Sequence, residues 1–142
     1  MKRRDEKRGS LGLCLRTDFA LRVLGHEATS LMNSIPEEFN FEKGKQVKAS
    51  WFKFSDLDAL LDAWNSLETF PPWIAEGLAR IRADVYDLTT AKEVSGDMVW
   101  DLQFGEKTPP ELKQVRRTAA SLASGANSTR RDLSALIKAL NS

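Results

Sequence analysis

Apolar residues recur at intervals of three and four along most of this chain. The spacing is clearest in five segments, at residues 21–35, 57–67, 74–88, 112–122 and 133–140. Because an α-helix turns once every 3.6 residues, this spacing places the apolar side chains on one stripe of each helix, and that stripe has to be buried. The chain is therefore constrained to fold as amphipathic helices around a shared core.

Local signals indicate where these helices begin and end. Pro36 ends the first helix, and Ser55 with Asp58 has the spacing of a capping box that starts the second. A Pro-Pro pair at residues 71–72 separates the second helix from the third. The small polar run at residues 124–127 predicts a break between the last two helices.

Residues 39–54 follow a different pattern, in which apolar and polar side chains alternate. Phe39 and Phe41 alternate before a Lys-Gly-Lys turn, and Val47 and Trp51 alternate after it. This pattern predicts a small β-hairpin, which must pack on helices because isolated hairpins are marginally stable. A second extended segment is expected around Trp100 and Leu102, after the third helix.

The length and composition predict one domain. The chain has 142 residues, of which 42% are hydrophobic, enough to bury a core without disulfide support. Residues 1–10 are mostly charged and are interpreted as a flexible basic arm. We expect a mainly α fold, a compact bundle of about five helices with a small β-hairpin, in a single helical domain at residues 11–142.

Cysteine content and hydropathy suggest the compartment. The single cysteine, Cys14, excludes an intramolecular disulfide, which fits a reducing environment. No apolar run approaches the roughly 18 residues that a membrane span needs. We therefore expect a cytoplasmic protein that does not engage a membrane.

Charge is sorted along the chain. Residues 1–50 carry ten Lys/Arg and seven Asp/Glu, residues 51–106 carry four and eleven, and residues 107–142 carry seven and two. The net charge of +1 is therefore the sum of +3, −7 and +5. Such asymmetry points to interaction surfaces, with an acidic middle and a basic C-terminal part.

The basic C-terminal part is the candidate binding surface. Arginine and lysine bind phosphate oxygens, and several such contacts hold a nucleic-acid backbone without reading its bases. The candidate residues lie off the apolar stripes of the last two helices: Lys113, Arg116, Arg117, Arg130, Arg131 and Lys138. The basic arm, with Arg3, Arg4, Lys7 and Arg8, is expected to assist.

Two further nucleic-acid interpretations are weaker. A helix-turn-helix around Gly125 would have Ser124 and Ala126 as poor core anchors. A base-stacking platform has the composition seen in three aromatic residues, Trp51, Phe52 and Phe54, which interleave with Lys48 and Lys53. Aromatic residues beside an amphipathic helix more often pack in the core.

No catalytic pattern emerges. Asp56, Asp58 and Asp62 cluster without the spacing of a calcium loop, so a solvated or docking face is the better interpretation. Cys14 and His26 are the only thiol and imidazole, and their separation gives no support for a dyad. We expect neither an enzyme nor a metal or other cofactor.

The leading functional expectation is a small non-enzymatic subunit that binds nucleic-acid backbone, DNA or RNA, within a nucleoprotein assembly containing other protein subunits. The alternative is a protein-interaction adaptor or inhibitor with complementary acidic and basic faces. Those faces would also permit self-association into a homo-oligomer.

Overall fold

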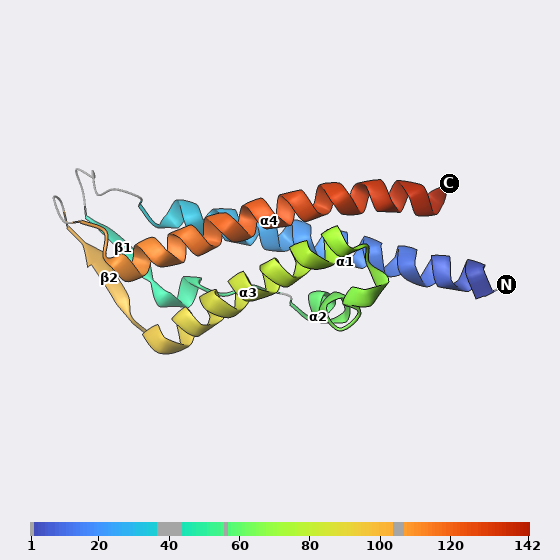
Figure 1. Ribbon diagram of the computed structural model, residues 1–142. Helices are drawn as coiled ribbons and strands as arrows, with labels where there is room; N and C mark the ends of the chain where they lie inside the picture. The colour runs from blue at the N-terminus through green and yellow to red at the C-terminus, as the bar shows by residue number, and fades with distance from the viewer. Residues whose placement is uncertain (1, 37–43, 56, 104–106) are drawn as a thin grey trace.

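The computed structural model describes residues 2–36, 44–55, 57–103 and 107–142, and Figure 1 shows how its elements are arranged. Within these ranges the chain forms four α-helices: α1 (Lys2–Ser34), α2 (Asp58–Trp64), α3 (Pro72–Ser95) and α4 (Pro110–Asn141). The shorter elements are the strands β1 (Lys45–Lys48) and β2 (Val99–Leu102) and the 3₁₀ turns η1 (Ala49–Trp51) and η2 (Leu67–Thr69). The mainly helical prediction is confirmed, with four helices in the described residues instead of about five.

Helices α1 and α4 form the long axis of the molecule. They run antiparallel and side by side, so the two chain ends lie at the same end of the molecule (Figure 1). α3 packs against α4, and α2 packs against α1 and α3. The predicted stripes face this centre, where the fully or almost fully buried side chains include Leu21, Leu24, Leu78, Ile81, Leu112 and Leu122.

The predicted break at residues 124–127 is wrong, because these residues lie inside one uninterrupted helix, α4. A Cβ atom at Gly125 would lie 3.6 Å from Cγ1 of Ile81 in α3. A Cβ atom at Gly25 in α1 would lie 3.5 Å from Cβ of Ala126. The small residues therefore mark where α1 and α3 approach α4 closely, and this packing offsets the low helix propensity of glycine.

The predicted hairpin at residues 39–54 is also wrong in its pairing. β1 pairs antiparallel with β2, with Val47 opposite Trp100, although α2 and α3 separate the two strands in the sequence. The expected first strand, with Phe39 and Phe41, lies outside the described residues. Alternation identified β1 and β2 as extended, but it does not say which strand pairs with which.

The predicted capping box at Ser55 and Asp58 does not form. α2 begins at Asp58, its N-cap is Leu57, and no side chain caps it. Ser55 is engaged by α1 instead, because its backbone N–H and its hydroxyl both donate to the carboxylate of Glu27, at 3.0 and 2.9 Å. Ser55 therefore makes a tertiary hydrogen bond to α1 in place of the predicted local one. α2 ends at Trp64, before the predicted end of its stripe at Leu67. Leu61, expected in the buried stripe of this helix, is exposed.

Helix α1 begins within the segment that was expected to be an arm. Its first residue is Lys2, so residues 2–10 form its first turns. The division of the chain at residue 10, and the mobility of the segment before it, stay predictions.

Candidate functional site

α4 carries all six basic residues that the sequence places in a candidate interface. It starts at Pro110, a favoured first helical residue because its missing N–H would have no helical partner. Glu111 in the first turn and Lys138 in the last have the charges that favour the helix dipole. The apolar stripe of α4 is buried as far as Leu133 and half-buried beyond it, at Leu136, Ile137 and Leu140. The basic side chains lie on the flanks and the outward face of the helix.

Arg116 is engaged by the protein itself. Its half-buried guanidinium donates from Nε to the backbone carbonyl of Ile35, at 3.0 Å. Ile35 directly follows the last residue of α1, where carbonyls lack helical partners and the helix dipole is negative. Arg116 therefore caps the C-terminus of α1.

Arg130 is also engaged within the fold. Its Nε donates to Oδ1 of Asp18 in α1, at 3.1 Å. The two side chains are only 34% and 27% exposed, so this ion pair is less screened by water than a surface pair. Arg130 therefore links α4 to α1.

The other four basic side chains, Lys113, Arg117, Arg131 and Lys138, leave α4 in nearly the same direction. At about 100° per residue, Arg131 coincides with Lys113, and Arg117 and Lys138 deviate from it by about 40° and 20°. Lys113 is half-buried and the other three are exposed. None of the four bonds to another residue in the described ranges. We call these four residues the basic face of α4.

The basic face of α4 is long and consists of two pairs. Lys113 and Arg117 are about 6 Å apart along the axis, Arg131 and Lys138 about 10 Å, and a gap of about 21 Å separates the pairs. Small uncharged residues, including Ala120, occupy this gap. With a break at 124–127 the pairs would lie on two different helices, whereas the continuous α4 aligns them over about 37 Å.

The aromatic residues considered for base stacking have different environments. Phe52 is buried and stacks on Trp100, with ring centroids 5.8 Å apart. Trp51 and Phe54 line a groove of about 690 Å³ beside α1. Glu27 belongs to the α1 wall of that groove, and Gly25 faces α4. The two residues are about 200° apart around the axis of α1. The aromatic groove is therefore on the side of α1 that faces away from α4.

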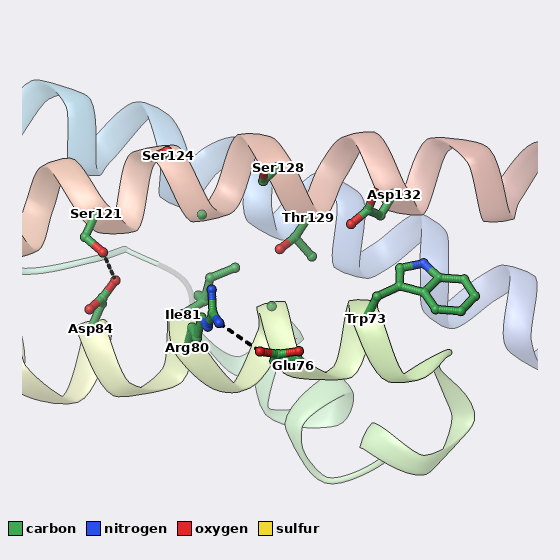
Figure 2. A pocket seen from close by; sticks show the side chains of 12 residues that line it. Trp73, Glu76, Arg80, Ile81, Asp84, Ser121, Ser124, Ser128, Thr129 and Asp132 are labelled. Carbon is green, nitrogen blue, oxygen red and sulfur yellow. Dashed lines mark hydrogen bonds and ion pairs between the residues drawn. The ribbon is translucent and has the colours of Figure 1, made fainter.

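A second candidate site, absent from the sequence predictions, lies between α3 and α4 (Figure 2). It is a groove of about 470 Å³. α3 supplies Trp73, Glu76, Gly77, Arg80 and Asp84. α4 supplies hydroxyl and carboxylate side chains, from Ser121, Ser124, Ser128, Thr129 and Asp132. We call this site the α3–α4 groove.

The α3–α4 groove has an excess of negative charge. Glu76 and Arg80 form an exposed ion pair at 2.8 Å, so the one cation of the described lining is already paired. Asp84 accepts a hydrogen bond from the hydroxyl of Ser121, at 2.9 Å. Burial raises the pKa of Asp84 above its ordinary value, and that hydrogen bond opposes the shift while the charge of neighbouring Asp87 adds to it.

Thr129 and Gly77 form the floor of this groove. Thr129 is 3% exposed and lines the groove, and its hydroxyl has no hydrogen-bond partner among the described residues. In the same part of the chain, no fully enclosed polar side-chain atom lacks a partner. The Thr129 oxygen is therefore open to the groove, over Gly77, where Figure 2 shows it turned toward α3.

The sequence does contain a signal for this groove. Ser121, Ser124, Ser128 and Asp132 are spaced by three and four residues, which places polar side chains on one face of a helix. A break at residues 124–127 would divide this pattern between two helices, whereas the continuous α4 places the four side chains on one face.

Other candidate chemistry does not assemble in the described residues. Cys14 is 2% exposed, and burial raises the pKa of its thiol. His26 is exposed and lies about 18 Å farther along α1, which is too far for a dyad. In the same ranges, three or more potential metal ligands do not come together. None of the helices described here is both long and apolar enough to cross a bilayer.

Comparison of the chain with protein-family models, with curated proteins and with solved structures gave no match.

Proposed function

We propose that the protein binds the phosphate backbone of nucleic acids through the basic face of α4, as a non-enzymatic subunit of a nucleoprotein assembly. One observation carries the proposal: Lys113, Arg117, Arg131 and Lys138 project from one side of one continuous helix, without partners among the described residues. Aligned cations of this kind bind phosphates and release counterions, and the contacts carry no base information.

Arg116 and Arg130 already bond to other residues of the fold. We therefore propose four of the six candidate residues as phosphate contacts. Breaking either internal contact would leave a carbonyl of Ile35 or the carboxylate of Asp18 without its partner. These two arginines therefore support the fold, and the proposed phosphate contacts are the four residues of the basic face.

The spacing of the two pairs makes the proposal specific about ligand length. The basic face extends over about 37 Å, which corresponds to about 11 base pairs at roughly 3.4 Å each. A duplex of about 12 base pairs lying along α4 reaches both pairs. A duplex of about six base pairs spans roughly 20 Å and reaches only one.

The experiment measures the affinity of labelled hairpin duplexes of these two lengths by fluorescence anisotropy at several salt concentrations. At about 0.9 per phosphate contact, the slope of log affinity against log salt is expected near −3.6 for the longer duplex and near −1.8 for the shorter. The double variant Lys113→Gln/Arg117→Gln should reduce the slope for the longer duplex to about −1.8.

The matched control is Arg16→Gln/Lys48→Gln, which removes the same charge from exposed residues of α1 and β1. Its slope should equal that of the wild type. A wild-type slope near zero, or an equal loss in the control, would show that α4 does not hold phosphates.

The alternative function, an adaptor or inhibitor with complementary faces, has one observation in its favour. The α3–α4 groove carries carboxylates such as Asp84 and Asp132, which a basic helix of a partner or of a second copy would complement. Sedimentation velocity at low and high salt tests the self-associating form. Salt-sensitive oligomers that disappear in both Arg131→Gln and Asp132→Asn would favour this alternative over nucleic-acid binding.

A further inference from the structure

We infer that the α3–α4 groove binds a linear organic polycation, an extended polyamine with ammonium groups at both ends and within its chain. The inference does not rest on the proposed nucleic-acid function, because the groove and the basic face of α4 use different residues.

The first support is the placement of the carboxylates. Asp84 lies beside Ser121 at one end of the groove, and Asp132 lies at the other end, as Figure 2 shows. Ser121 and Asp132 are eleven positions apart in α4, or about 16 Å along its axis. A single metal ion cannot contact both ends, whereas a chain with ammonium groups at its termini can.

The second support is the open hydroxyl of Thr129. Thr129 is only 3% exposed as a whole residue, yet its hydroxyl has no hydrogen-bond partner among the described residues. Because no fully enclosed polar side-chain atom in these residues lacks a partner, the Thr129 oxygen is accessible from the groove, where it can accept a hydrogen bond from a ligand. An ammonium within the ligand chain would donate to this oxygen at the floor of the groove.

The third support is an exposed indole at one end of the groove. Trp73 is 63% exposed, and Figure 2 shows its ring beside Asp132. An indole face attracts cations through its quadrupole and packs against methylene groups. Trp73 and Asp132 together suit a terminal ammonium and the methylenes next to it.

The lining between the two ends suits methylene segments. Ser124 and Ser128 are short, and Gly77 and Gly125 let the two helices pack closely beneath them. The groove is therefore lined by small side chains between its two ends, and the serines offer hydroxyl acceptors without charge. A flexible, narrow ligand fits such a groove better than a branched or globular one does.

The experiment is calorimetric titration of the full chain with spermine at low ionic strength, with 1,4-diaminobutane and Mg²⁺ as comparison ligands. Spermine is expected to bind at one site and at least about tenfold more tightly than either comparison ligand, because only spermine reaches both carboxylates. Its binding should change tryptophan fluorescence, and this change should be absent in Trp73→Phe.

The variants test the named contacts. Asp84→Asn and Asp132→Asn are each expected to weaken spermine binding about three- to fivefold, as for the loss of one partly exposed ion pair. Thr129→Val keeps the shape of the side chain and removes only the hydroxyl, so it should weaken binding about threefold without moving the midpoint of thermal unfolding. The matched controls, Asp62→Asn and Glu93→Gln, remove the same charge from exposed positions outside the groove.

The outcomes separate the possible occupants. Binding that Mg²⁺ matches, or that the control variants weaken equally, would mean diffuse attraction to acidic surface and would overturn the inference. Loss of a salt-sensitive dimer in Asp132→Asn, without spermine binding to the wild type, would assign the groove to a second copy. The variant Lys113→Gln/Arg117→Gln should not weaken spermine binding whether or not α4 binds nucleic acid, because it removes only positive charge near the groove.

Discussion

The hydroxyl oxygen of Thr129 occupies the space that a side chain at Gly77 would need. A Cβ atom at Gly77 would lie 2.5 Å from Oγ1 of Thr129, closer than real Cβ contacts permit. Glycine at this position therefore lets α3 and α4 approach closely, and it leaves the Thr129 oxygen open at the floor of the groove.

Gly77→Ala is expected to lower the free energy of unfolding by about 1–2 kcal/mol, because overpacking outweighs the gain of roughly 1 kcal/mol in helix propensity. In a Thr129→Ala background the same substitution should cost less or become stabilising, since the crowded oxygen is gone. Urea denaturation of the four proteins gives this coupling as a double-mutant cycle. Equal costs in both backgrounds would refute the contact.

Gly125→Ala is expected to stabilise the fold, in contrast to Gly77→Ala. A Cβ atom at Gly125 would be in ordinary contact with Ile81, at 3.6 Å, and the backbone there is helical. The substitution should therefore raise the free energy of unfolding by about 0.5–1 kcal/mol. A large destabilisation, measured by thermal unfolding, would instead support a turn at this position and would contradict a continuous α4.

The ion pair between Arg130 and Asp18 should couple α1 to α4. A double-mutant cycle with Arg130→Gln and Asp18→Asn is expected to give a coupling free energy of about 0.5–1 kcal/mol, as for partly exposed pairs. Arg131→Gln, at the neighbouring exposed position, serves as the control and should show no coupling to Asp18→Asn. Absence of coupling at Arg130 would return this residue to the set of candidate phosphate contacts.

Asp84 should make stability depend on pH. Because burial raises its pKa in the folded state, that state holds the proton more tightly than the unfolded chain does. The free energy of unfolding therefore falls as pH rises from the ordinary carboxyl pKa through the raised value. Asp84→Asn keeps an oxygen that can accept from Ser121 and removes this loss, so it should be more stable than wild type at pH 7. The difference should vanish at pH values below the ordinary carboxyl range, and denaturation curves at both pH values test this.

Cys14 should be inert in the folded protein. It is almost fully buried, and its raised pKa reduces the reactive thiolate. A thiol-specific chromogenic reagent should react at least about 100-fold more slowly with the native chain than with the chain in denaturant. Equally fast reaction in both conditions would show that this part of α1 opens readily.

The buried stripes were predictable because helical periodicity is a local property. Leu21 and Leu24 in α1 and Ile81 and Leu88 in α3 lie at their predicted places in the core. The partner of β1 was not predictable, because Val47 meets Trp100 across an intervening pair of helices. A local pattern carries no information about such a distant contact.

For the candidate sites too, some features follow from the local sequence and others depend on tertiary contacts. The sequence identified the basic residues of α4, but the tertiary structure engages Arg116 at the end of α1 and Arg130 with Asp18. The α3–α4 groove depends on two helices meeting at Gly77 and Thr129, so no single segment contained it.

The amino-acid sequence by itself determined that this chain buries apolar stripes in helices and that its C-terminal part is basic, because both follow from residue type and spacing. Only the tertiary structure decided that residues 124–127 continue a helix. Contacts with α1 and α3 stabilise the small residues there against their local preference for a turn. The continuity of α4 through these residues aligns its basic face and forms one wall of the α3–α4 groove.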